Sequence, residues 1–134
     1  MKIAIITDTH FGARNDSVQY DEYFYQFYEG QFFPYLQKHN IKTVIHLGDV
    51  LDRRKFVSYR IAKNFRERFI LPFQALDIEL HALVGNHDIF YKNTNDVNSL
   101  QELINERYKN IHRYPDAQEV TFDGLPILFM PWIN

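Results

Sequence analysis

Three short apolar runs, separated by longer segments of helical periodicity, are the feature that most constrains the fold of this chain. The runs cover Lys2 to Thr7, Lys42 to Leu47 and Ile78 to Val84, and each consists mainly of apolar residues. Runs of this kind are typical of strands that are buried on both faces. Strands that alternate with helices form right-handed crossovers and a parallel sheet. We therefore predict an α/β fold with a parallel βαβαβ core.

Helical periodicity fills the segments around these runs. A first helix is predicted from Ser17, its N-cap, to about Asn40, with a kink near Pro34 because proline lacks a backbone donor. A second helix is predicted from Ser58 to about Gln74, and a third from Asp96 to about Arg107. Residues at three- and four-residue spacing predict one buried stripe on the first helix: Phe24, Phe27, Tyr28, Phe32, Tyr35 and Leu36.

The last segment predicts two further strands. Val120 to Met130 is largely apolar and is divided by Asp123-Gly124, a dipeptide that favours the tight turn of a β-hairpin. The 134 residues suit one domain with one core, without repeats or linkers. The predicted organisation is a single unit, residues 1–134, with a C-terminal hairpin beside the parallel core.

The composition restricts the chemistry that is available to the chain. It has no cysteine, which excludes disulfides and thiolate metal sites and leaves His, Asp, Glu and Asn as candidate ligands. The net charge of −2 means that affinity for nucleic acid depends on a local patch. No apolar run approaches the roughly 20 residues of a membrane span, and the apolar N-terminus is too short for a signal peptide. We expect a soluble, cytoplasmic protein with no membrane partner.

A polar cluster follows each of the three predicted strands. Asp8-Thr9-His10 follows the first, Gly48-Asp49-Val50-Leu51-Asp52-Arg53 the second, and Gly85-Asn86-His87-Asp88 the third. The carboxyl ends of neighbouring parallel strands meet at one edge, where open α/β sheets bind their ligands. Each cluster alone occurs often by chance, but three at successive strand ends indicate a site.

The residue types in these clusters suit divalent metal ions. Asp8 and His10 alternate along an extended segment and can point at one ion. The carboxylate of Asp49 has two oxygens and can bridge two ions, and Asn86 offers a carbonyl oxygen. A sulfur-free set of oxygen and imidazole ligands suits Mn, Fe or Zn better than Ca. Two such ions about 4 Å apart would clamp a phosphoryl group and activate a water for in-line attack.

The motifs D-T-H, G-D-V-L-D and G-N-H-D, in this order and each after a strand, resemble those of the calcineurin-like metallophosphoesterase superfamily. The resemblance covers nearly the whole chain. It implies an α-β-β-α sandwich, of which this chain holds roughly the N-terminal half, and two divalent ions, Mn above all but also Mg, Fe or Zn. It also implies a role for each matching residue: Asp8 and His10 as ligands of the first metal, Asp49 as the bridging ligand, Asn86 as a ligand of the second metal, His87 as the catalytic imidazole, and Asp52 as the carboxylate that orients it.

A narrower resemblance is to the SbcD-type recombination endonuclease subunits, especially their phage versions. It rests on D-T-H-F-G, G-D-V-L-D-R-R-K, G-N-H-D-I-F-Y-K-N and F-D-G-L-P-I-L-F-M-P-W-I-N. It implies a Mn-dependent DNA exo- and endonuclease of a recombination and repair complex, a homodimer, an SbcC-type ABC ATPase partner, and the host cytoplasm if the protein is phage-encoded. Cellular members often continue the second motif with Asn-Lys-Pro-Ser, where this chain has Arg53-Arg54-Lys55. We hypothesise that Arg53 or Arg54 contacts substrate phosphate.

The superfamily completes its metal site with later histidines, in a G-H motif and a G-H-x-H motif, and neither occurs here. The second metal would keep only Asp49 and Asn86, and the first would lack one ligand. We therefore expect an N-terminal portion, either a fragment or the product of a split gene, that binds at most one metal well and is nearly inactive alone. An uncovered apolar face would favour self-association or pairing with a C-terminal fragment.

Simpler interpretations compete with these assignments. Asn86, His87 and Asp88 can form an ordinary turn, and His46 and His81 lie within strands, where core histidines satisfied by hydrogen bonds are commoner than ligands. The seven basic residues from position 53 to 68 can be a solvated helix face. The aromatic residues of the first helix can stack on bases, although packing in the core or at a dimer face is the commoner use.

Two other functions are compatible with the same ligands. One is a phosphodiesterase or phosphatase of the same superfamily that acts on a small molecule or a phosphoprotein. The other is a non-catalytic binding module with an incomplete site. The intact set of Asp8, His10, Asp49, Asp52, Asn86 and His87 argues against a degenerate site in this half.

Overall fold

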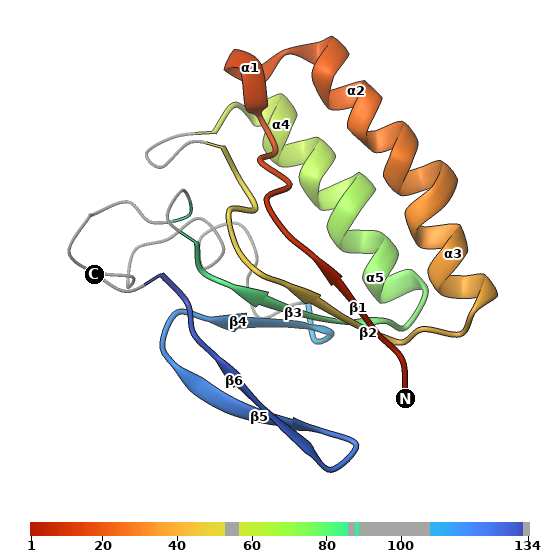
Figure 1. Cartoon of the computed structure of the whole chain (residues 1–134). Helices are drawn as coiled ribbons and strands as arrows, with labels where there is room; N and C mark the ends of the chain where they lie inside the picture. The colour runs from red at the N-terminus through yellow and green to blue at the C-terminus, as the bar shows by residue number, and fades with distance from the viewer. Residues whose placement is uncertain (53–56, 86–87, 89–107, 133–134) are drawn as a thin grey trace.

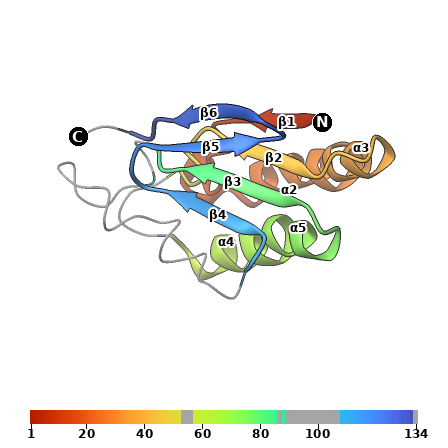
Figure 2. The same ribbon diagram turned by 90° about the horizontal axis from the view of Figure 1, so that it is seen from below.

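A computed structural model describes residues 1–52, 57–85, 88 and 108–132. Two helical segments cover one face of a four-stranded sheet, and a two-stranded hairpin lies against the other face (Figure 1). The view from below separates the helices from the hairpin, with the sheet between them (Figure 2). The predicted α/β architecture with a C-terminal hairpin is confirmed.

The four-stranded sheet is entirely parallel, in the order β1-β2-β3-β4. Its strands are β1 (Ile3–Ile6), β2 (Thr43–His46), β3 (Glu79–Leu83) and β4 (Ile111–Tyr114). The first three agree with the predicted strands. The fourth was not predicted, because His112 and Arg113 interrupt its apolar character. It pairs with β3 in register, Ile111 opposite Leu80.

The first helical segment consists of α1 (Ala13–Asp16), α2 (Val18–Phe27), the π-helical η1 (Tyr28–Phe32) and α3 (Phe33–Lys38). The predicted cap is present, since the backbone N–H of Tyr20 donates to Ser17 Oγ at 3.3 Å. The kink predicted near Pro34 stays a prediction. A π-helical stretch ends at Phe32, two residues before Pro34, which lacks the N–H that would bond to Gly30.

The second helical segment repeats this design. It consists of α4 (Tyr59–Asn64), the π-helical η2 (Phe65–Ile70) and α5 (Leu71–Ala75), with Ser58 as the N-cap, accepting from the N–H of Ile61 at 3.2 Å. Pro72 follows η2 just as Pro34 follows η1. The third predicted helix, from Asp96 to about Arg107, lies outside the described residues.

The core between helices and sheet is rich in aromatic rings. The ring of Phe11, just after β1, lies 5.0 Å from that of Phe69 and 5.5 Å from that of Tyr25. The predicted stripe on the first helix is wrong in part. Phe24, Phe27 and Tyr35 are exposed, and the buried residues of the segment are Asp21, Tyr25, Tyr28, Phe32, Phe33 and Leu36. The buried face is rotated away from the predicted one, because the rings at Tyr25 and Phe33 face the sheet.

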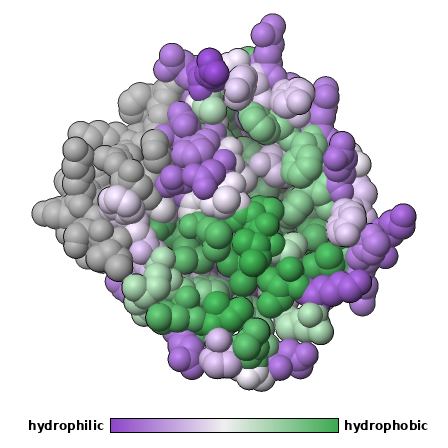
Figure 3. Space-filling view, in the orientation of Figure 1, coloured by the Kyte–Doolittle hydropathy of each residue, from purple (hydrophilic) through white to green (hydrophobic). Residues whose placement is uncertain are grey.

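The hairpin of β5 (Gln118–Phe122) and β6 (Leu125–Phe129) is antiparallel, and both turn residues, Asp123 and Gly124, have positive φ as a tight hairpin turn requires. A second, smaller core joins it to the sheet: Ile45, Leu83, Tyr114, Phe122 and Phe129. Apolar side chains remain exposed on the face that carries β1 and the hairpin (Figure 3). They include Ile5, Leu47, Leu125, Leu128 and Met130.

Among the described residues, no helix combines the length and apolar character that crossing a membrane requires.

Candidate metal centre

Backbone hydrogen bonds bring the ends of β1 and β2 together beyond the sheet. The N–H of Asp8 donates to the carbonyl of Gly48 at 3.1 Å, and the N–H of His10 donates to the carbonyl of Asp49 at 3.0 Å. A parallel bridge between Phe11 and Leu51 extends this pairing. The first two polar clusters of the sequence are therefore one structural unit.

Two glycines allow the end of β3 to approach this unit. Gly48 has φ of 115°, which a residue with a side chain rarely adopts. At Gly85, an added Cβ would lie 2.2 Å from the backbone N and 2.4 Å from Oδ1 of Asp49. Only glycine at position 85 lets the start of the third motif lie against Asp49.

Asp8, His10 and Asp49 form a compact group of potential metal ligands, one atom from each lying within 4.8 Å of the others. His10 Nε2 is 3.2 Å from Asp8 Oδ1 and 3.8 Å from Asp49 Oδ2. All three residues have positive φ, of 54°, 43° and 55°. Such strain in non-glycine residues is uncommon and is concentrated at functional sites. Two carboxylates and an imidazole fit a divalent ion such as Mn, Fe or Zn.

The other ring nitrogen of His10 faces Asp52, with Nδ1 3.3 Å from Oδ1. The described hydrogen bond of the ring runs from Nε2 to Asp8 Oδ1. A ring that bound a metal through Nε2 would carry its proton on Nδ1, next to the carboxylate of Asp52. This is how metal-binding histidines are commonly oriented. Asp52 was predicted to orient His87, which lies outside the described residues, so that role stays a prediction. The described contact of Asp52 is with His10.

The hydroxyl of Thr7 donates to Asp8 Oδ2 at 2.6 Å, and this hydrogen bond is the main reason why the pKa of Asp8 is lowered. The lowered pKa keeps Asp8 ionised, as a metal ligand must be. Asp8 and Asp49 also line an open hollow of about 610 Å³, which Gly85 and Trp132 border on the other side. The N–H of Trp132 donates to the carbonyl of Val84 at 2.8 Å, which brings the chain after the hairpin to the site.

The buried side chain of His46 connects the loops that follow β1 and β2 through hydrogen bonds. Its Nδ1 accepts from the N–H of Gly48 at 3.1 Å, and its Nε2 lies 2.9 Å from Thr9 Oγ1, which donates to the carbonyl of Val50 at 3.0 Å. This network assigns the proton to Nε2. Complete burial lowers the pKa of His46 to about 4, so the ring is neutral. The predicted core histidine is confirmed, as it is for His81, whose Nδ1 lies 2.7 Å from the Tyr114 hydroxyl.

Asp88 connects the second and third motifs, a role that the sequence did not predict. The sequence predicts that Asp88 bonds within its own turn, and it does accept from the N–H of Gly85 at 2.9 Å. It also accepts from the N–H of Leu51 at 3.1 Å, and it is fully buried. Burial raises the pKa of Asp88 to about 6. No local pattern in the sequence indicates this contact, because Leu51 lies 37 residues away.

Four predicted site residues, Asn86, His87, Arg53 and Arg54, lie outside the described residues, so their roles stay predictions. Within the basic run, Arg60 and Arg68 are engaged in pairs with the first helical segment. Arg60 Nη1 lies 3.2 Å from Asp21 Oδ2, and Arg68 pairs with Glu22 and Glu29. These two arginines connect helices, and the expectation of a solvated face does not apply to them.

Comparison with known proteins agrees with this geometry. The exonuclease subunit 1 of Enterobacteria phage T4 is 35% identical over 138 residues, which cover 99% of this chain and 38% of the phage protein. This chain therefore spans well under half the length of that relative. The sequence profile of the calcineurin-like phosphoesterases matches residues 1–131. The chain belongs to the calcineurin-like phosphoesterase family.

Proposed function

We propose that this chain forms part of the active site of a metal-dependent phosphodiesterase that cleaves DNA. The observation that carries the proposal is the Asp8, His10 and Asp49 group at the ends of β1 and β2, with Asp52 behind the imidazole. The family match supports phosphoester hydrolysis, and the similarity to a phage exonuclease subunit supports DNA as the substrate.

The described residues have distinct tasks in this proposal. Asp8, His10 and Asp49 hold a divalent ion, which we propose is Mn. A bound divalent ion polarises a phosphoryl oxygen and lowers the pKa of a water molecule. Asp52 fixes the ring of His10 and sets which nitrogen carries the proton. Thr7 keeps Asp8 ionised through its hydroxyl hydrogen bond.

The remaining assignments extend the proposal to a two-metal site. Asn86 would be a ligand of a second ion that Asp49 bridges, and His87 would give a proton to the leaving oxygen. Arg53 and Arg54 would contact the DNA backbone. The second ion lacks histidine ligands in this sequence, so we propose that the chain alone binds one ion well and turns over DNA very slowly.

The word "subunit" in the name of the phage relative supports a larger assembly. We propose that the working enzyme is a homodimer joined to an SbcC-type ABC ATPase and acts in recombination and repair.

Titration of the chain with Mn²⁺, followed by calorimetry and electron paramagnetic resonance, tests the metal centre. We expect one ion per chain, and a loss of affinity of at least tenfold in Asp49→Asn. Asp123→Asn, in the exposed hairpin turn, is the control and should bind normally. Equal affinity in Asp49→Asn would refute the assignment.

Hydrolysis assays separate the substrate classes. Linear DNA and a chromogenic phosphodiester are incubated with the chain and Mn²⁺. Slow cleavage of DNA that His87→Ala abolishes supports the proposal. Turnover of the chromogen alone would favour an enzyme for small molecules, and rapid turnover of DNA would contradict the need for further ligands.

A further inference from the structure

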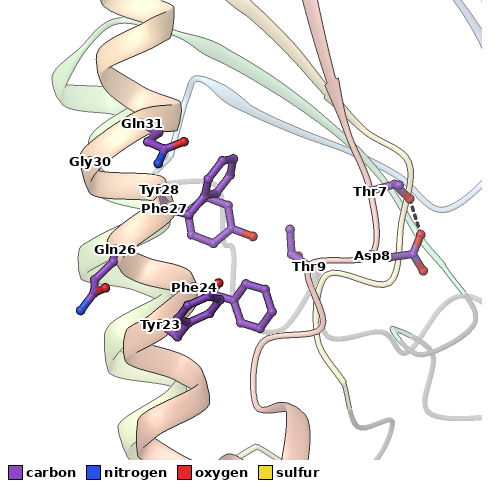
Figure 4. A pocket seen from close by; sticks show the side chains of 10 residues that line it. All are labelled: Thr7, Asp8, Thr9, Tyr23, Phe24, Gln26, Phe27, Tyr28, Gly30 and Gln31. Atoms are coloured by element: carbon purple, nitrogen blue, oxygen red, sulfur yellow. Dashed lines mark hydrogen bonds between the residues drawn. The ribbon is translucent and has the colours of Figure 1, made fainter.

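A second hollow, of about 710 Å³, lies between the end of β1 and the α2–η1 helix (Figure 4). Its volume falls within the roughly 300–1,000 Å³ that is usual for small-molecule sites. The residues that line it are Thr7, Asp8 and Thr9 from the strand end, and Tyr23, Phe24, Gln26, Phe27, Tyr28, Gly30 and Gln31 from the helix. It is separate from the hollow that Gly85 and Trp132 border, and Asp8 is common to both.

Three of the four rings that line this hollow are exposed. Tyr23 is 70% exposed, Phe27 45% and Phe24 37%, although all three belong to a helix whose opposite face is buried. Tyr23 meets Phe24 edge-on at 5.7 Å, and Phe27 meets the buried Tyr28 in the same way at 5.3 Å. The rings are therefore held in place by their neighbours while part of each remains available to a flat ligand.

The charge of the lining distinguishes between possible ligands. Among the described lining residues, Asp8 is the only carboxylate and none is Lys, Arg or His. A phosphate group would find no cation among these side chains. The polar side chains are instead Gln26 and Gln31, whose carboxamides can donate to and accept from a neutral heterocycle, and Thr7 and Thr9, whose hydroxyls already donate to Asp8 and to the carbonyl of Val50.

We propose that this hollow holds a nucleobase, belonging to the nucleotide next to the phosphodiester at the metal centre. The inference rests on the proposed function, because Asp8 places the hollow beside the metal group. The base would stack on Tyr23, Phe24 or Phe27, as aromatic side chains do in sites for single-stranded nucleic acid. The phosphate on one side of that nucleotide would then lie toward Asp49 and His10.

Binding of the neutral nucleoside deoxyadenosine tests the hollow without any phosphate or metal. The chain is titrated in EDTA and the backbone amide shifts of Tyr23 to Gln31 are followed by nuclear magnetic resonance. We expect saturable shifts with a Kd on the order of 1 mM, and no binding of 2-deoxyribose 5-phosphate. Tyr23→Leu and Phe24→Leu should each weaken deoxyadenosine binding roughly fivefold or more, since stacking on one ring is lost.

Tyr35→Leu is the matched control, because Tyr35 is exposed on the same helical segment but does not line the hollow. It should bind like the unaltered chain. The proposal is overturned if deoxyadenosine does not saturate, if the sugar phosphate binds equally well, or if Tyr23→Leu and Phe24→Leu bind normally. The main alternative is that this surface forms a contact between two copies of the chain, and sedimentation of the same variants tests it. Variants that reduce self-association but not nucleoside binding would make this surface a contact between copies and overturn the proposal.

These outcomes are independent of the metal centre. Asp49→Asn should keep nucleoside binding, since Asp49 does not line this hollow. Absence of Mn²⁺ binding by the unaltered chain, with intact nucleoside binding, would therefore count against the proposed function and not against the base site.

Discussion

Asp8, His10 and Asp49 all adopt left-handed backbone conformations, and each costs about 1–3 kcal/mol relative to an ordinary conformation. Such strain persists only where the surroundings impose it. Here the carbonyls of Gly48 and Asp49 hold the backbone of Asp8 and His10, and His46 holds Gly48. The strain is therefore sustained by backbone hydrogen bonds between the two loops and by the buried ring of His46.

A substitution of Asp52 tests whether this carboxylate orients the ring of His10. Asp52→Asn keeps the size of the side chain but removes the charge opposite His10 Nδ1, so the imidazole loses its fixed orientation. We expect Mn²⁺ affinity to fall by about 10- to 100-fold. Asp77→Asn, an exposed residue before β3, is the control. Calorimetry that shows equal affinity in Asp52→Asn would show that His10 does not depend on this carboxylate.

Gly85→Ala tests the close approach of the third motif. The new Cβ would overlap the backbone N and Oδ1 of Asp49, so Asp49 must move. We expect a loss of stability of about 1–3 kcal/mol and a weaker metal site. Gly30→Ala is the matched control, because its Cβ meets no atom within 4 Å. Urea denaturation and Mn²⁺ titration measure both effects, and normal metal binding by Gly85→Ala would count against the tight approach.

Sequence patterns were sufficient to predict that the candidate ligands lie close together, but not which residues support them. Asp8, His10 and Asp49 were predictable because strand ends in a parallel sheet must converge. The role of Asp88 was not, because its partner Leu51 is 37 residues away and no local pattern records that contact. The same holds for the contact between Asp52 and His10, which depends on how the second loop folds back over the first.

The two helical segments share an unusual design, a π-helical stretch followed by a proline. Pro34 and Pro72 each remove one backbone donor, and η1 and η2 each end two residues before the proline. The extra residue of a π-turn shifts the angular position of every residue that follows. This shift helps explain why a uniform 3.6-residue period misplaced Tyr35. The proline indicates that the helix is irregular nearby, but it does not indicate at which residue the π-turn begins.

The two segments are joined by a buried acid. Asp21 accepts from Arg60 Nη1 and Asn64 Nδ2, each at 3.2 Å, and burial raises its pKa. Asp21→Ala leaves two partly buried donors without this acceptor, so we expect a loss of about 1–3 kcal/mol in the free energy of unfolding. Glu29→Ala removes an exposed partner of Arg68 and should cost about 0–1 kcal/mol. Urea denaturation compares the two, and equal losses would contradict the role of burial.

At the scale of the whole molecule, buried histidines connect stability to pH. Burial lowers the pKa of both His46 and His81 to about 4, from an ordinary value of 6.5. The unfolded chain binds these protons first as the pH falls, so the folded state is fully favoured above pH 6.5 and is destabilised between pH 6.5 and 4. For His46 the loss is roughly 3 kcal/mol. Urea denaturation at pH 7 and pH 4.5 measures it.

Protonation of Asp88 has the opposite effect on the stability of the folded chain. Its pKa is raised to about 6 from 3.8, so the folded chain takes up this proton first and gains stability between pH 6 and 3.8. His46→Gln should therefore flatten the loss of stability on acidification, and Asp88→Asn should steepen it. His39→Gln, on the partly exposed residue after α3, should leave the profile unchanged. A profile that is the same in all three variants would contradict this account.

The position of Asp88 also has a consequence for how such sites diverge or can be redesigned. One carboxylate accepts hydrogen bonds from both Gly85 and Leu51, so the backbone of the second motif is an architectural component of the third. A G-N-H-D segment grafted onto another sheet without a compatible G-D-V-L loop would bury its aspartate without the N–H donor that Leu51 supplies here. We therefore expect that the two loops have to be engineered as one module, with a change in the length of either compensated in the other.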